Sequence, residues 1–351
     1  MSSSTPDIRT RLLIISDTHG RRPFDAAIHP EEAQRYGFSR PLPKADVAIH
    51  CGDLTTRSDV KEYQVTFDVM REIDAPLKLV IPGNHDCSMD VDFWEKTYAR
   101  KSRYLPPETL DRLRQQPQET YAVVEKARQD GVHVLVAEGT YHFVLANGAR
   151  LTVYASPWTP RYGNWGFQYD PDANIAIEGG HNFQIEEGTD VAMTHGPPYS
   201  ILDMTRRGAE DAGCRGLLAA VRKARPRVHC FGHIHEAYGA MLMPWENEGE
   251  KMMLEWNGMD EMKMEWEGSG ADRAEIVPLS LCPQDRETLG AVPGEHTLFV
   301  NAAIMDVHYR PLQSPWLVDL ELPPPDAEHA VKAEQTRNVL STPTTVGNFS
   351  W

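Results

Sequence analysis

Five short clusters of aspartate, asparagine and histidine residues in this sequence could bind metal ions. Each one closely follows a short apolar run. The clusters are Asp17-Thr18-His19, Gly52-Asp53, Gly83-Asn84-His85-Asp86, His195-Gly196-Pro197-Pro198 and Gly232-His233-Ile234-His235. Their carboxylate, amide and imidazole groups, with no thiolate among them, form a donor set that suits divalent ions such as Mn, Fe, Zn or Co. The pattern therefore predicts a metal site and the hydrolytic chemistry that metals support.

Each cluster alone has an ordinary explanation. Gly-Asp and Gly-Asn-His-Asp are common turn sequences. His233 and His235 form a stronger signal, because alternate residues of a strand face the same side. Only the joint occurrence of all five clusters, each behind an apolar run, favours one shared metal site over five separate turns.

The apolar runs between the clusters predict the elements that position them. Runs rich in branched residues predict strands at 12–15, 47–49, 77–81, 132–136, 151–154, 191–193, 228–231, 298–300 and 316–320. Helical spacing predicts helices over 60–74 with Ser58 as N-cap, over 106–127, either continuous or broken at Pro117, and over 214–221. Such alternation indicates an α/β architecture, in which the carboxyl ends of strands converge on one crevice.

Taken together and in this order, the five clusters resemble the calcineurin-like metallophosphoesterase superfamily over residues 10–240. Two further stretches, Ser156-Pro157-Trp158 and 162–167, are similar to its metallophosphoesterase-domain-containing branch. The resemblance implies a two-sheet β-sandwich flanked by helices, the four-layer αββα type.

The resemblance also implies two divalent metal ions, with Mn as first choice and Fe, Zn or Co as alternatives. One ion would be held by Asp17, His19, Asp53 and His235, and the other by Asp53, Asn84, His195 and His233, so that Asp53 bridges them. His85 would face the substrate, oriented by Asp86. The alternatives are a purely structural His85 and an Asp86 that only closes a turn.

Hydrolysis of a phosphate ester needs hydroxide at neutral pH and a screen for the negative charge of the phosphate. Two ions roughly 3.5–4 Å apart can bridge a water, lower its pKa and clamp the substrate oxygens. In this scheme His85 donates a proton or hydrogen bond to the phosphoryl or leaving-group oxygen. Further substrate contacts are expected from Arg21 and Arg57, which suit a phosphate, and from Trp158 and Trp165, which suit a nucleobase.

The chain is expected to form one metallophosphoesterase domain over residues 8–322, followed by a polar C-terminal tail over 323–351. The domain would contain an inserted acidic excursion rich in Met, Glu and Trp at about 241–296. The sequence names no protein partner for this excursion.

The charge balance restricts the partners. Lys and Arg number 35 against 51 Asp and Glu, a net charge of −16, which argues against a broad nucleic-acid or anionic-membrane surface. The start MSSSTPDIRT has no apolar run behind a basic end, and the run 12–15 is too short to span a membrane. Five scattered cysteines without a CxxC pair fit a reducing cytosol, so a cytoplasmic location is expected.

We therefore predict a metal-dependent phosphodiesterase that uses a metal-bridging hydroxide on a small, nucleotide-like phosphate ester. The alternatives are a phosphomonoesterase and a nucleotide-binding protein of the same fold with little turnover.

Overall fold

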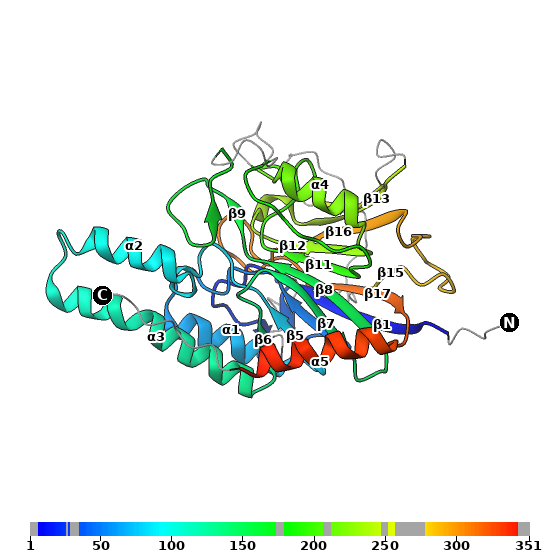
Figure 1. The fold of residues 1–351 in the computed structure, drawn as a ribbon, viewed down its shortest axis with the longest axis horizontal. Coiled ribbons are helices and arrows are strands. Elements are labelled where there is room, and N and C mark those ends of the chain that lie inside the picture. Colours follow the sequence, from blue (N-terminus) through cyan, green and yellow to red (C-terminus); the bar gives the residue numbers. More distant parts are fainter. Residues whose placement is uncertain are drawn as a thin grey trace.

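Two β-sheets packed face to face form the centre of the computed structural model (Figure 1). The structure describes residues 6–25, 27–28, 35–172, 179–205, 212–246, 252–256 and 278–342. The first sheet has six strands in the order β15 (Leu279–Ser280), β17 (Trp316–Leu322), β1 (Ile8–Ile15), β4 (Val47–His50), β5 (Leu77–Val80) and β6 (Val132–Val134). β1, β4, β5 and β6 run parallel, so their carboxyl ends lie at one edge.

The second sheet has seven strands with parallel strands at its centre. Their order is β14 (Met252–Trp256), β13 (Gly239–Pro244), β16 (His296–Asn301), β12 (Val228–Phe231), β11 (Val191–Thr194), β8 (Arg150–Ser156) and β7 (Gly139–Val144). Two short ribbons pair β2 (Phe24–Asp25) with β3 (Ser39–Arg40) and β9 (Thr159–Pro160) with β10 (Gln168–Tyr169).

Strand alternation divides the core into three layers, as β1 illustrates. Leu12 and Ile14 join the cluster between the two sheets, whereas Leu13 and Ile15 join the cluster beneath the helices outside the first sheet. Those helices are α1 (Val60–Glu72) and α3 (Pro107–Gln129), while α4 (Arg215–Ala224) covers the second sheet on the opposite side (Figure 1). The arrangement confirms the predicted αββα sandwich.

The helices differ from the sequence prediction in detail. Asp59, not Ser58, caps α1: its carboxylate accepts the Lys61 amide hydrogen, in a capping box with Glu62. Of the two alternatives for α3, the continuous helix is correct, and Pro117 lies buried inside it. Helix α2 (Val91–Lys101) was not predicted; with the start of α3 it projects from the sandwich (Figure 1).

Among the described residues, no helix combines the length and the apolar composition of a membrane-spanning segment.

The predicted tail contains a helix, α5 (Ala327–Ser341), that docks on β7. His329 Nε2 lies 3.0 Å from the Phe143 carbonyl oxygen, and the Thr336 hydroxyl accepts the His142 amide hydrogen at 3.0 Å. Polar groups make these contacts, so the docked face lacks the apolar periodicity from which a helix is predicted.

The predicted excursion at 241–296 begins too early. Residues 241–244 complete β13, whose Ala240, Met241, Leu242 and Met243 are buried between β16 and β14. Most of the acidic stretch, 247–251 and 257–277, lies outside the described residues.

Candidate metal centre

The carboxyl ends of five parallel strands bring all seven predicted ligands to one place. Asp17 and His19 follow β1, Asp53 follows β4, Asn84 follows β5, His195 follows β11, and His233 and His235 follow β12. Asp17, Asn84 and His195 are completely buried. Sequence positions more than 200 residues apart thus form one site at the strand ends.

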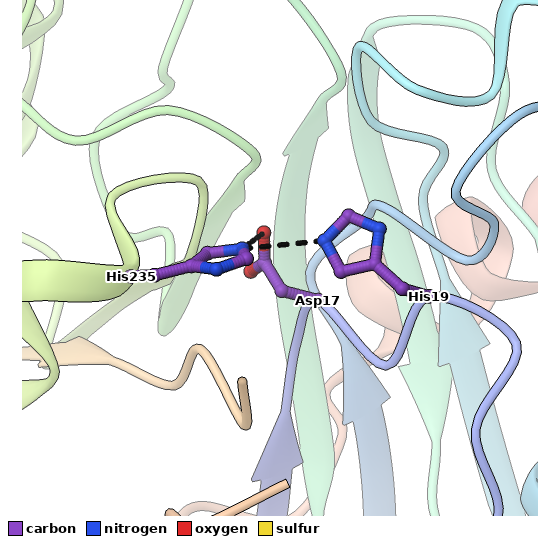
Figure 2. Close-up of side chains that lie close together, drawn as sticks. All are labelled: Asp17, His19 and His235. Carbon is purple, nitrogen blue, oxygen red and sulfur yellow. Dashed lines mark hydrogen bonds and ion pairs between the residues drawn. The ribbon is translucent and has the colours of Figure 1, made fainter. Parts of the chain in front are cut away.

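Six of the seven ligands, all except Asn84, form two groups of three. Asp17, His19 and His235 make one group, and Asp53, His195 and His233 the other; in each, one potential ligand atom from every residue lies within 4.8 Å of the others. Figure 2 shows the first group: Nε2 of His235 lies 3.3 Å from Asp17 Oδ1, and Nε2 of His19 faces Nε2 of His235.

Asp53 lies between the two groups. Its Oδ1 is 3.3 Å from His195 Nε2, and its Oδ2 is 3.8 Å from His19 Nε2. The two oxygens of one carboxylate therefore face different groups, so this residue could contact an ion in each of them.

Backbone carbonyls fix the orientation of the imidazoles. Nδ1 of His19 lies 2.9 Å from the Thr55 oxygen, Nδ1 of His195 lies 2.9 Å from that of Cys51, and Nδ1 of His235 lies 3.1 Å from that of Asp306. Because a carbonyl only accepts, each Nδ1 carries a hydrogen, and the Nε2 atoms turn inward, where a metal ion or a second proton can bind them.

The inward-facing atoms fit a cation. Nε2 of His19 and Nε2 of His235 are only 3.2 Å apart, and Asn84 Oδ1 lies 2.9 Å from His195 Nε2. Lone pairs that face each other at this distance need a proton or a metal ion between them. Nitrogen and oxygen donors of this kind suit Mn, Fe, Zn or Co.

The pKa values of the metal-free groups agree with this arrangement. Burial raises the pKa of Asp17, but the hydrogen bond from His235 and the charges of His235 and His195 together outweigh it and lower the pKa to about 2. Burial lowers the pKa of His19 to about 4 and that of His233 to about 3. At neutral pH Asp17 is thus ionised, and His19 and His233 are neutral. In His195 and His235 burial is instead outweighed by the neighbouring aspartates, which raise both pKa values, so a metal ion would displace a proton from these two imidazoles.

The backbone at the site adopts conformations that are rare outside glycine. Asp17, His19, Asp53 and His233 have φ of 54°, 45°, 53° and 69°. Such strain concentrates at functional sites, where the surrounding structure maintains it. Gly232 allows the closest approach, since a Cβ there would overlap the Asp17 carboxylate.

His85 stands beside the metal groups, with Nε2 3.9 Å from Asp53 Oδ2. Its orientation differs from the prediction, because Nδ1 lies 2.7 Å from the Thr56 carbonyl oxygen and not against Asp86. The Asp86 carboxylate instead accepts hydrogen bonds from the amides of Gly83, Leu54 and Thr55 and from the Thr55 hydroxyl. Asp86 thereby ties the loop after β5 to the loop after β4, as in the alternative that made it a turn residue.

Of the four expected substrate contacts, the two tryptophans line a pocket near the ligand groups, and the two arginines are exposed on the surface. Trp165 packs against His85 with ring centroids 4.3 Å apart. Together with Trp158 it lines a pocket of about 460 Å³ beside α2. Arg21 and Arg57 are exposed, and no hydrogen bond or ion pair between described residues joins either side chain to the metal groups.

Sequence reasoning missed two tyrosines. Tyr162 accepts a hydrogen bond from Asn84 Nδ2 at 2.9 Å, and the ring of Tyr309 lies 4.7 Å from that of His19. Burial and the charges of Asp53 and Asp17 raise the pKa of both phenols. The polar stretch 306–310 behind a predicted strand was the available signal for Tyr309.

Comparison with known proteins places this geometry in a family. The family model for calcineurin-like phosphoesterases matches residues 10–237. The chain belongs to this family. Its members use divalent metal ions, and the two ligand groups lie where this calcineurin-like phosphoesterase would hold them.

Two curated relatives are similar to this chain over part of their length. Metallophosphoesterase domain-containing protein 1 of Homo sapiens and that of Mus musculus are each 32% identical over 233 residues, which cover 66% of this chain and 62% of theirs. The chain thus matches less than two thirds of their length. A solved structure, TT1561 of Thermus thermophilus, matches with a TM-score of 0.35 and 11% identity over 70% of this chain and 98% of that one.

Proposed function

We propose that this protein is a phosphodiesterase that hydrolyses small, nucleotide-like esters at a dinuclear metal centre. The position of Asp53, with one oxygen toward each ligand group, carries the proposal. When bound, two divalent ions would supply an activated water and screen the charge of the phosphate.

His85 is proposed as the proton donor to the leaving oxygen. Its Nδ1 is committed to the Thr56 carbonyl, so only Nε2, on the Asp53 side, can exchange a proton with the substrate. Trp165 packs on the same ring and limits its movement.

A nucleotide-like organic group is supported by the aromatic pocket next to His85. Trp158 and Trp165 provide stacking faces, and Lys96, Arg100 and Arg161 line the same pocket. Manganese is proposed as the native metal. The cytosol is proposed as the location, because all five cysteines are free. The proposed partner is a small phosphate ester, with neither a nucleic-acid polymer nor a membrane.

The experiment is hydrolysis of bis-p-nitrophenyl phosphate by the full chain with Mn, Fe, Zn or Co, in parallel with Asp53→Asn and His85→Ala. We expect metal-dependent turnover in the wild type, a loss of about 10²–10⁴ in His85→Ala, and a greater loss in Asp53→Asn, because the amide lacks the negative charge and one of the two oxygens that face the ligand groups. Equal rates in the three proteins would reject the enzyme. A strong preference for p-nitrophenyl phosphate would instead identify a phosphomonoesterase.

A further inference from the structure

Two tyrosine rings cover the two ligand groups. The Tyr162 ring lies 5.3 Å from that of His233, in the group of Asp53. The Tyr309 ring lies 4.7 Å from that of His19 and 5.3 Å from that of His235, in the group of Asp17. Each group therefore has one phenol beside it.

The hydroxyl hydrogens of both phenols are available. The Tyr162 oxygen accepts the Asn84 amide hydrogen, so its own hydrogen is left for another acceptor. Within the described ranges, no hydrogen bond engages the Tyr309 hydroxyl, whose residue is 39% exposed. Both groups can donate to a ligand that enters the site.

A rigid turn holds Tyr309 in place. The Asp306 carboxylate accepts the amide hydrogens of His308 at 2.9 Å and Arg310 at 2.8 Å, and also binds the Arg310 guanidinium. Tyr309 itself has a φ of 58°, which non-glycine residues rarely adopt. The turn thus adopts an unusual conformation that presents this one ring.

The groups that pair with the two aspartates of the site are imidazoles. The ion-pair partners of Asp17 and Asp53 among the described residues are His19, His85, His195 and His235. No lysine or arginine of the described chain pairs with either carboxylate. A phosphate monoester carries a second negative charge, for which a cationic side chain is the stronger partner, whereas a diester carries one charge that neutral donors can satisfy beside the ions.

We propose that Tyr162 and Tyr309 form a clamp of two neutral hydroxyl donors that binds the two non-esterified oxygens of a phosphodiester above the ligand groups. This inference rests on the proposed function and assigns the two residues that would bind the phosphate of the diester. The clamp would act equally in the bound substrate and in the transition state, so it contributes to KM more than to kcat.

The test uses the Mn-loaded full chain with Tyr162→Phe, Tyr309→Phe and the double variant; Tyr104→Phe, an exposed phenol between α2 and α3, is the matched control. Calorimetry with dimethyl phosphate, an inert diester, measures binding without turnover. Each site variant should bind it about 10-fold more weakly, the loss expected for one hydrogen bond to a charged oxygen. KM for bis-p-nitrophenyl phosphate should rise similarly at saturating Mn²⁺, with kcat changed less than about twofold. Mn²⁺ affinity should stay within about twofold in Tyr309→Phe, whereas Tyr162→Phe also removes the acceptor of the Asn84 amide hydrogen and is therefore compared only when fully loaded.

Tyr309→Arg tests the substrate class, because it places a cation where the neutral donor was. It should raise kcat/KM for p-nitrophenyl phosphate relative to the diester by about 10-fold. An unchanged ratio would overturn the diester assignment.

Wild-type binding and KM in both Phe variants, together with loss of activity in Asp53→Asn, would overturn the clamp and leave the proposed function standing. Equal turnover in wild type and Asp53→Asn would remove the proposed function, and the calorimetry would still decide whether the two phenols bind a diester.

Discussion

The backbone carbonyl of Asp306 lies 3.1 Å from Nδ1 of His235, a residue 71 positions earlier in the chain. The same residue closes the turn that carries Tyr309 through its carboxylate. One turn behind β16 therefore orients a proposed metal ligand and places a proposed substrate contact. This turn lies beyond residues 10–237, the part that matches the family model.

Asp306→Ala should weaken metal binding in the group that contains His235. The carbonyl remains, but the turn loses the carboxylate that fixes its position; loss of such an outer contact typically costs about 10–100-fold in metal affinity. Calorimetric titration with Mn²⁺ should show one weakened site and one unchanged. Asp326→Ala is the matched control, because its carboxylate also caps backbone amides but at the start of α5. Two equally weakened sites, or none, would contradict this role.

The raised pKa of His195 predicts that metal binding depends on pH. Burial lowers its pKa, but the charge and hydrogen bond of Asp53 together with the charge of Asp17 outweigh this and raise the pKa to about 9 in the metal-free protein. At pH 7.5 a proton therefore occupies the place of the metal, and binding must expel it. Mn²⁺ affinity should rise about tenfold per pH unit below 9 for this one proton. Titrations at pH 7.5 in buffers of different ionisation enthalpy should show the released proton, and identical heats would contradict it.

The same shift has a consequence for the stability of the metal-free protein. The pKa of His195 in the folded protein lies above its unfolded value of about 6.5. Its contribution to the free energy of unfolding is therefore complete below pH 6.5 and is lost as the pH rises through 9. Urea unfolding of the chelator-treated chain between pH 6 and 9.5 should show this decline. His195→Gln, which does not titrate, should flatten that part of the profile.

The sequence located the ligands because each follows a parallel strand whose apolar run is visible in the chain. It could not locate the groups that orient them, because Thr55, Cys51 and Asp306 act through backbone carbonyls that have no side-chain signature. Asp86 shows the same limit: its position beside His85 suggested a contact, but the turn directs its carboxylate at three amides. Helix α5 escaped detection because polar residues make part of its buried face.

Asp86→Asn tests whether Asp86 holds the loops after β4 and β5 together or orients His85. The amide can replace only part of the carboxylate's acceptor capacity, and one buried unsatisfied group costs about 1–3 kcal/mol. The variant should therefore lower the free energy of unfolding by roughly that amount, while the pH profile of kcat keeps its shape because Thr56 still holds His85. If the acid limb of the kcat profile moved to another pH while the free energy of unfolding stayed the same, Asp86 would instead have the orienting role.

Gly232→Ala tests the close approach of the two sheets at the metal centre. A Cβ at position 232 would lie 2.6 Å from Ser16 Cβ and overlap the Asp17 carboxylate, so either the ligand or the strand end must move. Gly139→Ala is the matched control, since neither glycine has a positive φ and nothing lies within 4 Å of a Cβ at 139. The first variant should lose the metal bound by Asp17, His19 and His235 and most of its diesterase activity, and the second should keep both. Two bound ions per chain in Gly232→Ala, measured by metal analysis, would mean that the Asp17 carboxylate is not held where the structure places it.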